Sequence, residues 1–305
     1  MKLVSLSFSL SALFVSLAYA DNYTTRQIGA PHSKNYKIYI EKDGIPISPF
    51  HDIPLFADTT SSTMNMVVEI PRWTNAKYEI NKETPLNPII QDIRDGEPRF
   101  NYNIFPYKGY MWNYGALPQT WEDPNFITEE SGTIGDNDPI DVIEIGEKIG
   151  YTGEVKPVKI LGVIGLLDQN ETDWKLVAID VNDPNASDMN DISDVEKKYP
   201  GLLNDTIDYF RKYKIPVGDG PNEFMFSGKA QDKEYAIGQI MTTHNHWKKL
   251  VSGDIKENNI EKTNLLVEGS PYKVSPNSKI ILNIPPVNLL PAVPIDPKYE
   301  RWYYV

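Results

Sequence analysis

Asp136, Asp138 and Asp141 place three carboxylates within six residues, in a segment that reads Gly-Asp-Asn-Asp-Pro-Ile-Asp. Like charges this close repel one another and raise each other's pKa values unless a cation neutralises them. A hard divalent cation such as Mg²⁺ does this well, because it prefers carboxylate oxygens and retained waters. A solvated acidic turn is the alternative. An EF-hand calcium loop is excluded, because Ile140 stands where a ligand is needed and Asp141 where glycine is needed.

Four further acidic residues stand in pairs near predicted strand ends. Asp168 and Asp173 flank Gln-Asn-Glu-Thr after an apolar run, and Glu69 and Glu79 bracket a short segment that contains Lys77. Taken singly, each fits a surface charge better than a metal ligand. Together they exceed what one metal needs, which favours two or more metals, the arrangement used for phosphoryl chemistry.

Basic and phenolic side chains at other element boundaries can face these carboxylates. An arginine offers a planar fork for phosphate oxygens, and a lysine offers a compact positive charge. The residues in question are Lys77, Arg99, Lys175 and the pair Tyr213-Lys214. A lone lysine or arginine on an acidic protein is usually a solvated ion-pair partner, so the indication comes from the group.

The histidines and the absence of cysteine argue against a zinc site of the usual kind. The pair in His244-Asn-His246 is two residues apart on a predicted helix, so the side chains point to different faces, and we assign them to surface or capping roles. No cysteine is present in the 305 residues. Zinc sites are commonly built from both residue types.

The elements that must position these groups are strands first and helices later. Short runs rich in valine and isoleucine, bounded by turn residues, predict strands at 36–41, 64–70, 140–145, 158–167 and 174–181. Helical signals follow at 191–198, 201–214 and 232–250. This order favours an α+β fold that is mainly β. After about residue 266 the composition becomes proline-rich, which predicts an extended surface segment over 267–305.

The composition and the first residues suggest an exported acidic protein. The chain carries 30 basic and 42 acidic residues, for a net charge of −12, which disfavours nucleic-acid binding. Residues 1–20 have a basic start, an apolar run and Ala18-Tyr19-Ala20 before Asp21, which predicts a cleaved secretory signal peptide rather than a membrane anchor. We therefore expect a secreted protein, or one otherwise in the secretory route, without membrane attachment after cleavage.

Four glycosylation sequons agree with export, although each triplet alone is a weak signal. They begin at Asn22, Asn170, Asn185 and Asn204. The lack of cysteine is unusual for an exported protein, because disulfides commonly stabilise such proteins.

The run from Asp136 to Val142 resembles the signature of the soluble family I inorganic pyrophosphatases. Segments 67–77, 113–124, 171–175, 198–203 and 211–216 are similar to the fungal and animal branch of that family, and they occur in the family's order. The resemblance covers roughly residues 23 to 251, within a domain that we place at 21–266. It implies a five-stranded OB-like β-barrel with flanking helices, hydrolysis of diphosphate to two phosphates with several Mg²⁺ ions in each active site, and a homodimer.

The resemblance also implies a role for each matching residue. Asp136, Asp141 and Asp173 would hold the metal that activates water, and Asp138 would accept the proton of that water. Metals that arrive with substrate would be held by Glu79, Asp168 and Asp173, with Glu69 supporting them. Phosphate oxygens would be gripped by Lys77, Arg99, Tyr114, Lys175, Tyr213 and Lys214.

Two departures from the family pattern qualify this interpretation. Family members typically carry an acidic residue and then glycine after the aspartate matching Asp168, whereas Gln169 and Asn170 stand here. Export is the second departure. An inactive or repurposed paralogue that binds phosphate or metal is the alternative, as is a broader phosphohydrolase.

Overall fold

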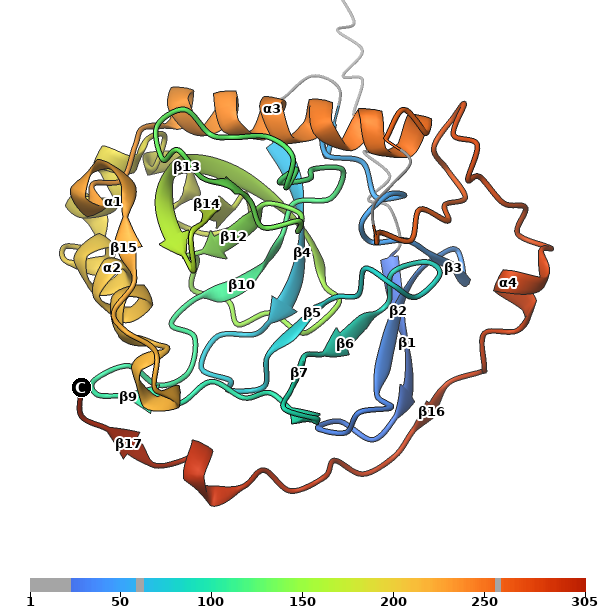
Figure 1. Ribbon diagram of the computed structural model, residues 1–305, viewed down its shortest axis with the longest axis horizontal. Coiled ribbons are helices and arrows are strands. Elements are labelled where there is room, and N and C mark those ends of the chain that lie inside the picture. The colour runs from blue at the N-terminus through green and yellow to red at the C-terminus, as the bar shows by residue number, and fades with distance from the viewer. Residues whose placement is uncertain (1–22, 59–62, 256–258) are drawn as a thin grey trace, which may run out of the picture.

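A closed ring of five strands forms the centre of the fold (Figure 1). The computed structural model describes residues 23–58, 63–255 and 259–305. Pairing runs from β13 to β4, β10, β12 and β14, and β14 pairs again with β13. The five strands are β4 (Thr63–Ile70), β10 (Asn113–Ala116), β12 (Asp141–Glu144), β13 (Val155–Asp168) and β14 (Glu171–Asp180). The prediction of a mainly β fold built on a five-stranded barrel is confirmed.

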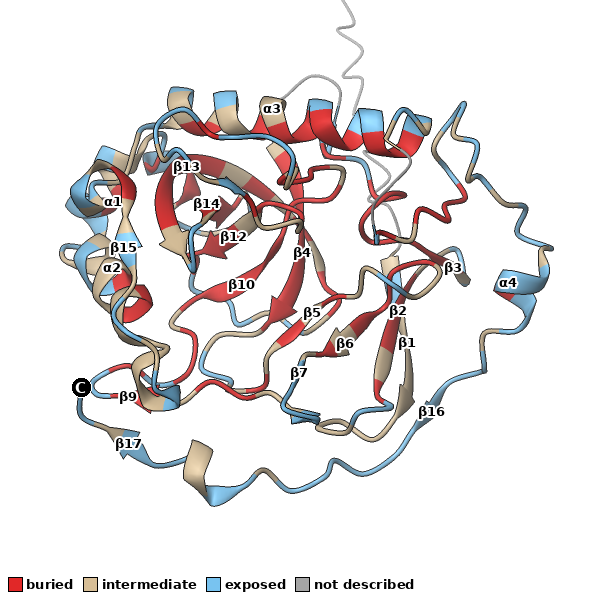
Figure 2. Cartoon of the chain, in the orientation of Figure 1, coloured by how far each residue is buried: buried red, intermediate tan, exposed pale blue. Residues whose placement is uncertain are grey.

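Most residues of the barrel strands are buried, and Figure 2 shows β4, β10, β12 and β14 mainly in red. Their sequences are therefore rich in apolar residues without a strict alternation of apolar and polar positions, and charged residues among them such as Glu69 and Lys175 are themselves buried. Gly115 lies where the register shifts between β10 and β4, and a Cβ there would stand 1.9 Å from the Val67 carbonyl oxygen. Only glycine lets these two strands approach so closely.

A second sheet packs beside the barrel and contributes one strand to the site. Its order is β16-β1-β2-β6-β5, with β3 beside β2. These strands are β1 (Tyr23–Gly29), β2 (Lys37–Lys42), β3 (Ile45–Ile47), β5 (Tyr78–Ile80), β6 (Ile89–Gln91) and β16 (Asn288–Leu289). The shorter strands are β7 (Ile93–Arg94), β8 (Glu97–Pro98), β9 (Asn103–Ile104), β11 (Ile134–Gly135), β15 (Glu223–Phe224) and β17 (Trp302–Tyr303).

The predicted helices are present and carry their own start signals. Asp191 caps α1 through a capping box with Asp194, and Asp232 caps α3 by accepting from the Tyr235 amide at 2.9 Å. The α-helices are α1 (Ile192–Lys198), α2 (Leu202–Lys212), α3 (Lys233–Ser252) and α4 (Lys279–Leu282). Single 3₁₀ turns are η1 (Ala186–Asp188), η2 (Ile215–Val217), η3 (Met225–Gly228) and η4 (Pro297–Tyr299).

The histidine pair on α3 lies in the interior, so our surface or capping assignment is wrong. His244 and His246 are both buried, and the His244 ring stacks on Trp247. The His244 Nδ1 atom lies 2.6 Å from the Gln119 carbonyl oxygen, which satisfies that nitrogen. Helix α3 lies across one end of the barrel (Figure 1), and its inward side covers apolar surface. The two rings fill that interface, which periodicity alone did not reveal.

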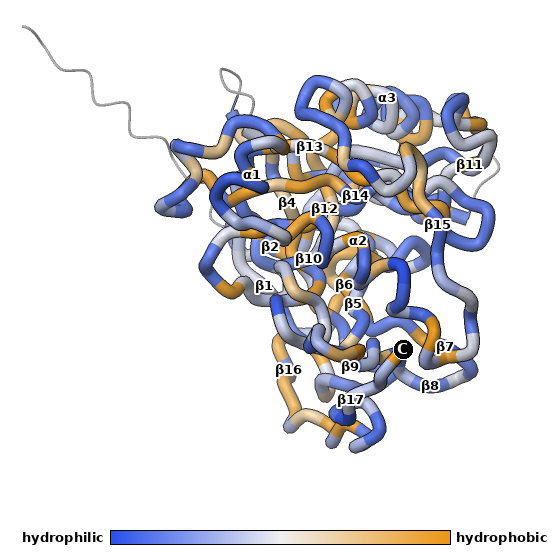
Figure 3. The backbone as a smooth tube through the Cα atoms, turned by 90° about the vertical axis from the view of Figure 1, so that its left-hand side faces the viewer, coloured by the Kyte–Doolittle hydropathy of each residue, from blue (hydrophilic) through white to orange (hydrophobic). Residues whose placement is uncertain are grey.

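The C-terminal segment runs along the outside of the fold, past the second sheet and on to β9 (Figure 1). β16 pairs in parallel with β1, and β17 pairs in parallel with β9. Apolar side chains such as Val287 and Leu289 are exposed along it, and Figure 3 shows this stretch in the hydrophobic colour on the outer side of the chain. The segment is thus tied down at two places, mainly through its backbone.

Candidate active site

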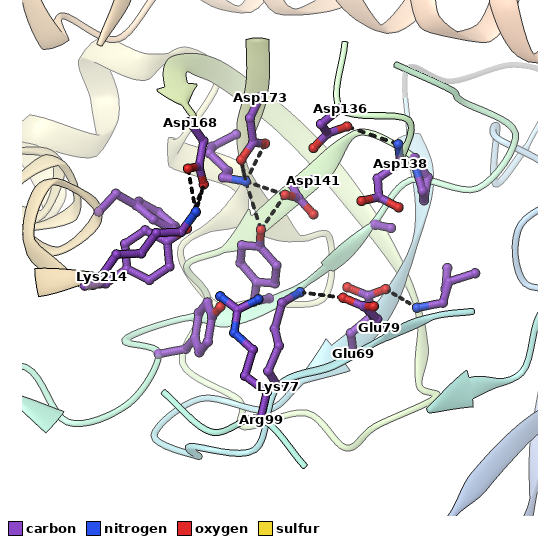
Figure 4. A pocket seen from close by; sticks show the side chains of 18 residues that line it. Glu69, Lys77, Glu79, Arg99, Asp136, Asp138, Asp141, Asp168, Asp173 and Lys214 are labelled. Carbon is purple, nitrogen blue, oxygen red and sulfur yellow. Dashed lines mark hydrogen bonds and ion pairs between the residues drawn. The ribbon is translucent and has the colours of Figure 1, made fainter. Parts of the chain in front are cut away.

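The barrel and its neighbouring elements converge on one polar cavity of about 150 Å³. Seven carboxylates and four cationic side chains line it, together with three tyrosines (Figure 4). All thirteen residues to which the sequence interpretation gave a catalytic, substrate-binding or metal-binding role are among them. They are Glu69, Lys77, Glu79, Arg99, Tyr114, Asp136, Asp138, Asp141, Asp168, Asp173, Lys175, Tyr213 and Lys214.

Strand pairing explains why residues far apart in the chain meet here. β12 runs parallel to β14 in a register that sets Asp141 beside Lys175. Asp173 precedes Lys175 by two residues, so both side chains project from the same face of β14. The Lys175 amine accordingly bonds to Asp141 and to Asp173, and it lies 3.0 Å from the Tyr114 hydroxyl. This amine is the centre of the site's ion-pair network.

Two more lysines neutralise carboxylates on opposite sides of the cavity. The Lys214 amine holds both oxygens of Asp168 at 2.5 and 2.6 Å, while the Lys82 amine lies 2.7 Å from Asp138. Figure 4 places Asp168 and Lys214 on one side and Asp136 and Asp138 on the other. The cavity therefore has two distinct ends.

Burial sets the electrostatics of the carboxylates. Loss of water raises the pKa of Glu69 to about 8, although Lys77 opposes the rise. Burial likewise raises the pKa of Asp173 to about 7, against the pull of Lys175. Burial first, and then the Asp138 charge, raises the pKa of Asp136 well above its usual range. The lysines nearby do not supply enough positive charge for all these buried carboxyl groups to be ionised at once. A bound cation would supply the missing charge, so the site favours one.

Glu122 is a carboxylate that the sequence interpretation quoted in a motif and gave no role. Its side chain is buried, and ligand oxygens of Glu122, Asp136 and Asp173 all lie within 4.8 Å of one another. One Glu122 oxygen accepts from the Trp174 amide at 3.1 Å, while the other is buried without a hydrogen-bond partner. Buried orphan oxygens are costly, and the donor set is of the type that divalent metals take.

The backbone of Glu122 also holds the acidic loop in place. Its amide donates to the Asp138 carbonyl at 2.9 Å, and its carbonyl accepts from the Asn137 amide at 2.9 Å. Asn137 has φ of 69°, a left-handed conformation that asparagine tolerates. The sequence offered one signal for Glu122, because the residue lies in the segment 113–124 that resembles the family. Its role in the site became visible only from its contact with the acidic loop, which begins fourteen residues later at Asp136.

Comparison with known proteins decides the family. Residues 66–248 match the family model described as inorganic pyrophosphatase. The chain belongs to the inorganic pyrophosphatase family. Curated relatives named inorganic pyrophosphatase include one from Kluyveromyces lactis, 55% identical over 93% of this chain and 98% of its own. Another, from Neurospora crassa, is 51% identical over 94% of this chain and 98% of its own.

Solved pyrophosphatase structures share the fold. The enzyme from Schistosoma japonicum has a TM-score of 0.86 and 47% identity, and the match covers 93% of this chain and all of that one. A truncated vacuolar soluble pyrophosphatase from Trypanosoma cruzi, solved in complex with PPi, has a TM-score of 0.70 and 38% identity over 82% of this chain and 99% of that one. The chain is therefore an enzyme that hydrolyses diphosphate, and the expected family I resemblance is confirmed.

Inorganic pyrophosphatases use divalent metal ions, and the cavity has the donors for them. Oxygen-only ligand sets of this kind suit Mg²⁺. The buried orphan oxygen of Glu122 and the crowded carboxylates beside it fit such an ion.

Glu122→Gln is expected to weaken Mg²⁺ binding about tenfold, because supporting carboxylates around metal sites typically contribute 10- to 100-fold in affinity. Glutamine keeps the volume and can still accept from the Trp174 amide. The measurement is calorimetric titration of the variant with Mg²⁺ in the absence of substrate. Unchanged affinity would show that Glu122 acts only through its backbone.

Proposed function

We propose that this enzyme is a secreted, Mg²⁺-dependent inorganic diphosphatase that uses the cavity residues in the roles which the family resemblance implies. The observation that supports the proposal is their convergence. Side chains from all five barrel strands, from β5 and from the residues just after α2 meet in one cavity. A dispersed set of surface charges would not do so.

The carboxylates would be the metal-binding part of the site. Asp136, Asp141, Asp173, Asp168 and Glu79 would hold several Mg²⁺ ions, with Glu69 fixing the position of β5 by accepting from the Ile80 amide at 2.7 Å. When bound, Mg²⁺ offsets the charge of the substrate and lowers the pKa of water from ~15.7 towards ~7. The overall negative charge of the chain is therefore compatible with an anionic substrate.

The cationic and phenolic side chains would grip diphosphate. Lys77, Arg99 and Lys214 point into the cavity from different elements. The Arg99 guanidinium is held by Asp92 at 2.8 Å, which leaves the rest of its planar fork for phosphate oxygens. Tyr114, Tyr213 and Lys175 complete the set of donors. Phosphoryl transfer needs mainly such positioning and charge stabilisation.

Phosphate release from diphosphate tests the proposal most directly. The purified protein should release phosphate with Mg²⁺ and lose that activity in excess chelator. The Mg²⁺ concentration at half-maximal activity should be higher at pH 5 than at pH 7, because carboxyl groups with raised pKa values, such as Asp173 and Glu69, must lose protons to bind metal. Full activity in chelator would contradict metal dependence.

The turn between β13 and β14 is expected to influence how tightly the active site binds Mg²⁺. Gln169 and Asn170 both have positive φ, 51° and 68°, in a two-residue turn directly after Asp168. The double variant Gln169→Glu with Asn170→Gly should lower the Mg²⁺ concentration for half-maximal activity about two- to fivefold, because it adds a carboxylate next to a metal-site aspartate. Mg²⁺ titrations of activity measure this.

Asn170→Gly alone is the control for that experiment, because it removes the sequon and leaves the charge unchanged. Identical Mg²⁺ and pH profiles of the double variant and the parent would contradict the tuning role. Asn170 is exposed at the tip of the turn. A glycan there would stand beside the cavity, and the single variant would reveal its effect.

Export rests on the sequence of residues 1–20, which lie outside the described residues, as does Asn22. Of the other sequons, Asn204 is exposed on α2, whereas the Asn185 side-chain amide donates to the Tyr199 hydroxyl at 3.0 Å.

No helix in the described part of the chain is long and apolar enough to cross a membrane. N-terminal sequencing of protein from the medium of a eukaryotic host should begin at Asp21. An intact Met1 in the cell fraction would contradict secretion.

A homodimer and the division of the chain at residue 266 remain predictions. Exposed aromatic side chains support the first, since Trp73, Phe105, Trp302 and Tyr304 are each at least 43% exposed. Phe105 contacts both Trp302 and Tyr304. Sedimentation analysis should give twice the chain mass, and a monomer at micromolar concentration would contradict it.

A further inference from the structure

A second cavity adjoins the active site at the end away from Asp138. It has a volume of about 460 Å³ and shares Arg99, Tyr213 and Lys214 with the catalytic cavity. Neither Asp136 nor Asp138 lines it. We call this second cavity the vestibule. A group bound in the vestibule would therefore lie next to the side chains that are proposed to bind phosphate in the catalytic cavity.

The walls of the vestibule come from three separate segments. Arg94 belongs to β7 of the β7–β8 hairpin, and Lys214 follows α2. Lys298 and Tyr299 come from the C-terminal segment, on η4. The segment that runs along the outside of the fold therefore completes a cavity next to the active site.

Hydrogen bonds fix the C-terminal wall in position. The Asn103 amide donates to the Tyr299 carbonyl at 3.2 Å, and the Tyr303 hydroxyl donates to the Lys298 carbonyl at 3.3 Å. The pairing of β17 with β9 holds the next residues. The Lys298 side chain is consequently presented from an anchored backbone rather than from a free chain end.

The charges of the lining favour an anion. Four cationic side chains, Arg94, Arg99, Lys214 and Lys298, line the vestibule with two carboxylates, Asp95 and Glu97, of which Asp95 is exposed. Arg99 and Lys214 also pair with Asp92 and Asp168 at the catalytic end, so the cations most available to a ligand in the vestibule are Arg94 and Lys298. One of the two carboxylates, Glu97, has a side chain that is 77% exposed and is paired with Lys34 at 3.4 Å. Its charge is therefore directed to solvent and largely screened.

The cations of the outer wall are held only loosely. The Lys298 amine lies 3.5 Å from Asp296, with both side chains about half exposed, and Arg94 lies 3.7 Å from Asp219. Exposed pairs of this kind contribute little. A multiply charged phosphoryl group can therefore recruit Lys298 at low cost. Arg94 faces a buried Asp219 oxygen that has no hydrogen-bond partner, so Arg94 would share its charge between Asp219 and the ligand.

We propose that the vestibule is a subsite for the additional phosphoryl group of a linear phosphate chain longer than diphosphate, such as tripolyphosphate. This inference rests on the proposed function, because two phosphoryl groups of the chain would occupy the catalytic cavity. The third would extend past Arg99 and Lys214 to Arg94 and Lys298. Arg94 and Lys298 do not line the catalytic cavity, so diphosphate bound there would not contact them.

The test is inhibition of diphosphate hydrolysis by tripolyphosphate at a fixed concentration of free Mg²⁺. Lys298→Ala should raise the inhibition constant about three- to fivefold, as expected for loss of one partly exposed charged contact. The KM for diphosphate should change less than twofold. Lys298→Arg keeps the charge and should retain the parental inhibition constant. Lys197→Ala removes an exposed lysine paired with Asp194 on α1 and serves as the matched control.

Each result decides the matter. If Lys298→Ala and Arg94→Ala both leave the inhibition constant unchanged, the subsite is absent. If a variant raises the inhibition constant for tripolyphosphate and the KM for diphosphate in the same proportion, it disturbs the catalytic cavity, and the subsite is again refuted. A parent protein that does not hydrolyse diphosphate would instead contradict the proposed function, so the two failures are distinguishable.

Discussion

Replacing Asp138 by Asn is expected to lower kcat for diphosphate hydrolysis by about 10²- to 10⁴-fold, the range for loss of a general base. Asp138 lines the cavity, and its side chain is 42% exposed, so the attacking water can reach it. Asparagine has nearly the same shape and can still accept from Lys82. What it lacks is the capacity to take a proton from water, which isolates that step.

The position of the backbone should survive this substitution. Asp138 is held through its main chain, because its amide donates to an Asp136 oxygen at 3.0 Å and its carbonyl accepts from the Glu122 amide. Mg²⁺ titration of the variant should therefore give an affinity near that of the parent. Steady-state kinetics with a measured free Mg²⁺ concentration would separate a fall in kcat from a change in KM.

Asp208→Asn is a matched control for the ion pair. Asp208 lies 2.8 Å from Lys212 with a side chain that is 36% exposed, close to the values for Asp138 and Lys82, and it does not line the cavity. It should retain parental kcat. A loss of less than tenfold in Asp138→Asn would remove Asp138 as proton acceptor. Loss of Mg²⁺ binding together with activity would assign it to the metal-binding set instead.

The sequence predicted the barrel and the cavity well because both depend on local signals. The strands at 64–70, 158–167 and 174–181 are rich in valine, isoleucine and leucine because most of their residues are buried, although charged residues such as Glu69, Lys159 and Lys175 interrupt the apolar runs. The cavity residues stand in motifs whose order matches a family. These two kinds of information do not require knowledge of which residues pair.

What the sequence did not predict depends on pairings between distant segments. Glu122 meets Asp136 and Asp173 because its backbone is bonded to the acidic loop and its side chain accepts from the Trp174 amide on β14. Lys82 meets Asp138 from 56 positions earlier in the chain. The outer sheet was predicted only at β2, because its other strands are short and β16 joins β1 from more than 250 residues away. Periodicity carries no information about such partners.

A buried ion-pair triad shows the same limit and leads to the largest expected effect on stability. Lys156, Glu144 and Asp180 lie on β13, β12 and β14, and the Lys156 amine lies 3.0 Å from Glu144 and 3.2 Å from Asp180. Glu144 is fully buried and also accepts from the Asn113 amide at 2.7 Å and the Gly146 amide at 2.7 Å. The sequence interpretation gave none of these three residues a role.

Lys156→Met is expected to lower the free energy of unfolding by about 3–5 kcal/mol, the cost of leaving a buried charge without its partner. Methionine roughly preserves the apolar stem of lysine, so the loss reports the charge rather than a cavity. The triad ties together β12 and β14, which carry Asp141 and Asp173, but it does not line the active-site cavity. Denaturant unfolding without metal measures the change.

The same chain offers for comparison a pair in which the lysine is exposed and the carboxylate of Glu154 is buried but also accepts from the Tyr151 amide at 3.3 Å. Lys148 lies 3.1 Å from Glu154, nearly the distance between Lys156 and Glu144, but its side chain is 71% exposed rather than 2%. Lys148→Met should therefore cost less than about 1 kcal/mol. Equal losses for the two variants would show that burial does not set the strength of the triad. Because the triad does not touch substrate, folded Lys156→Met should keep kcat within a fewfold of the parent, and a selective loss of kcat would give these residues a role in catalysis that their position does not support.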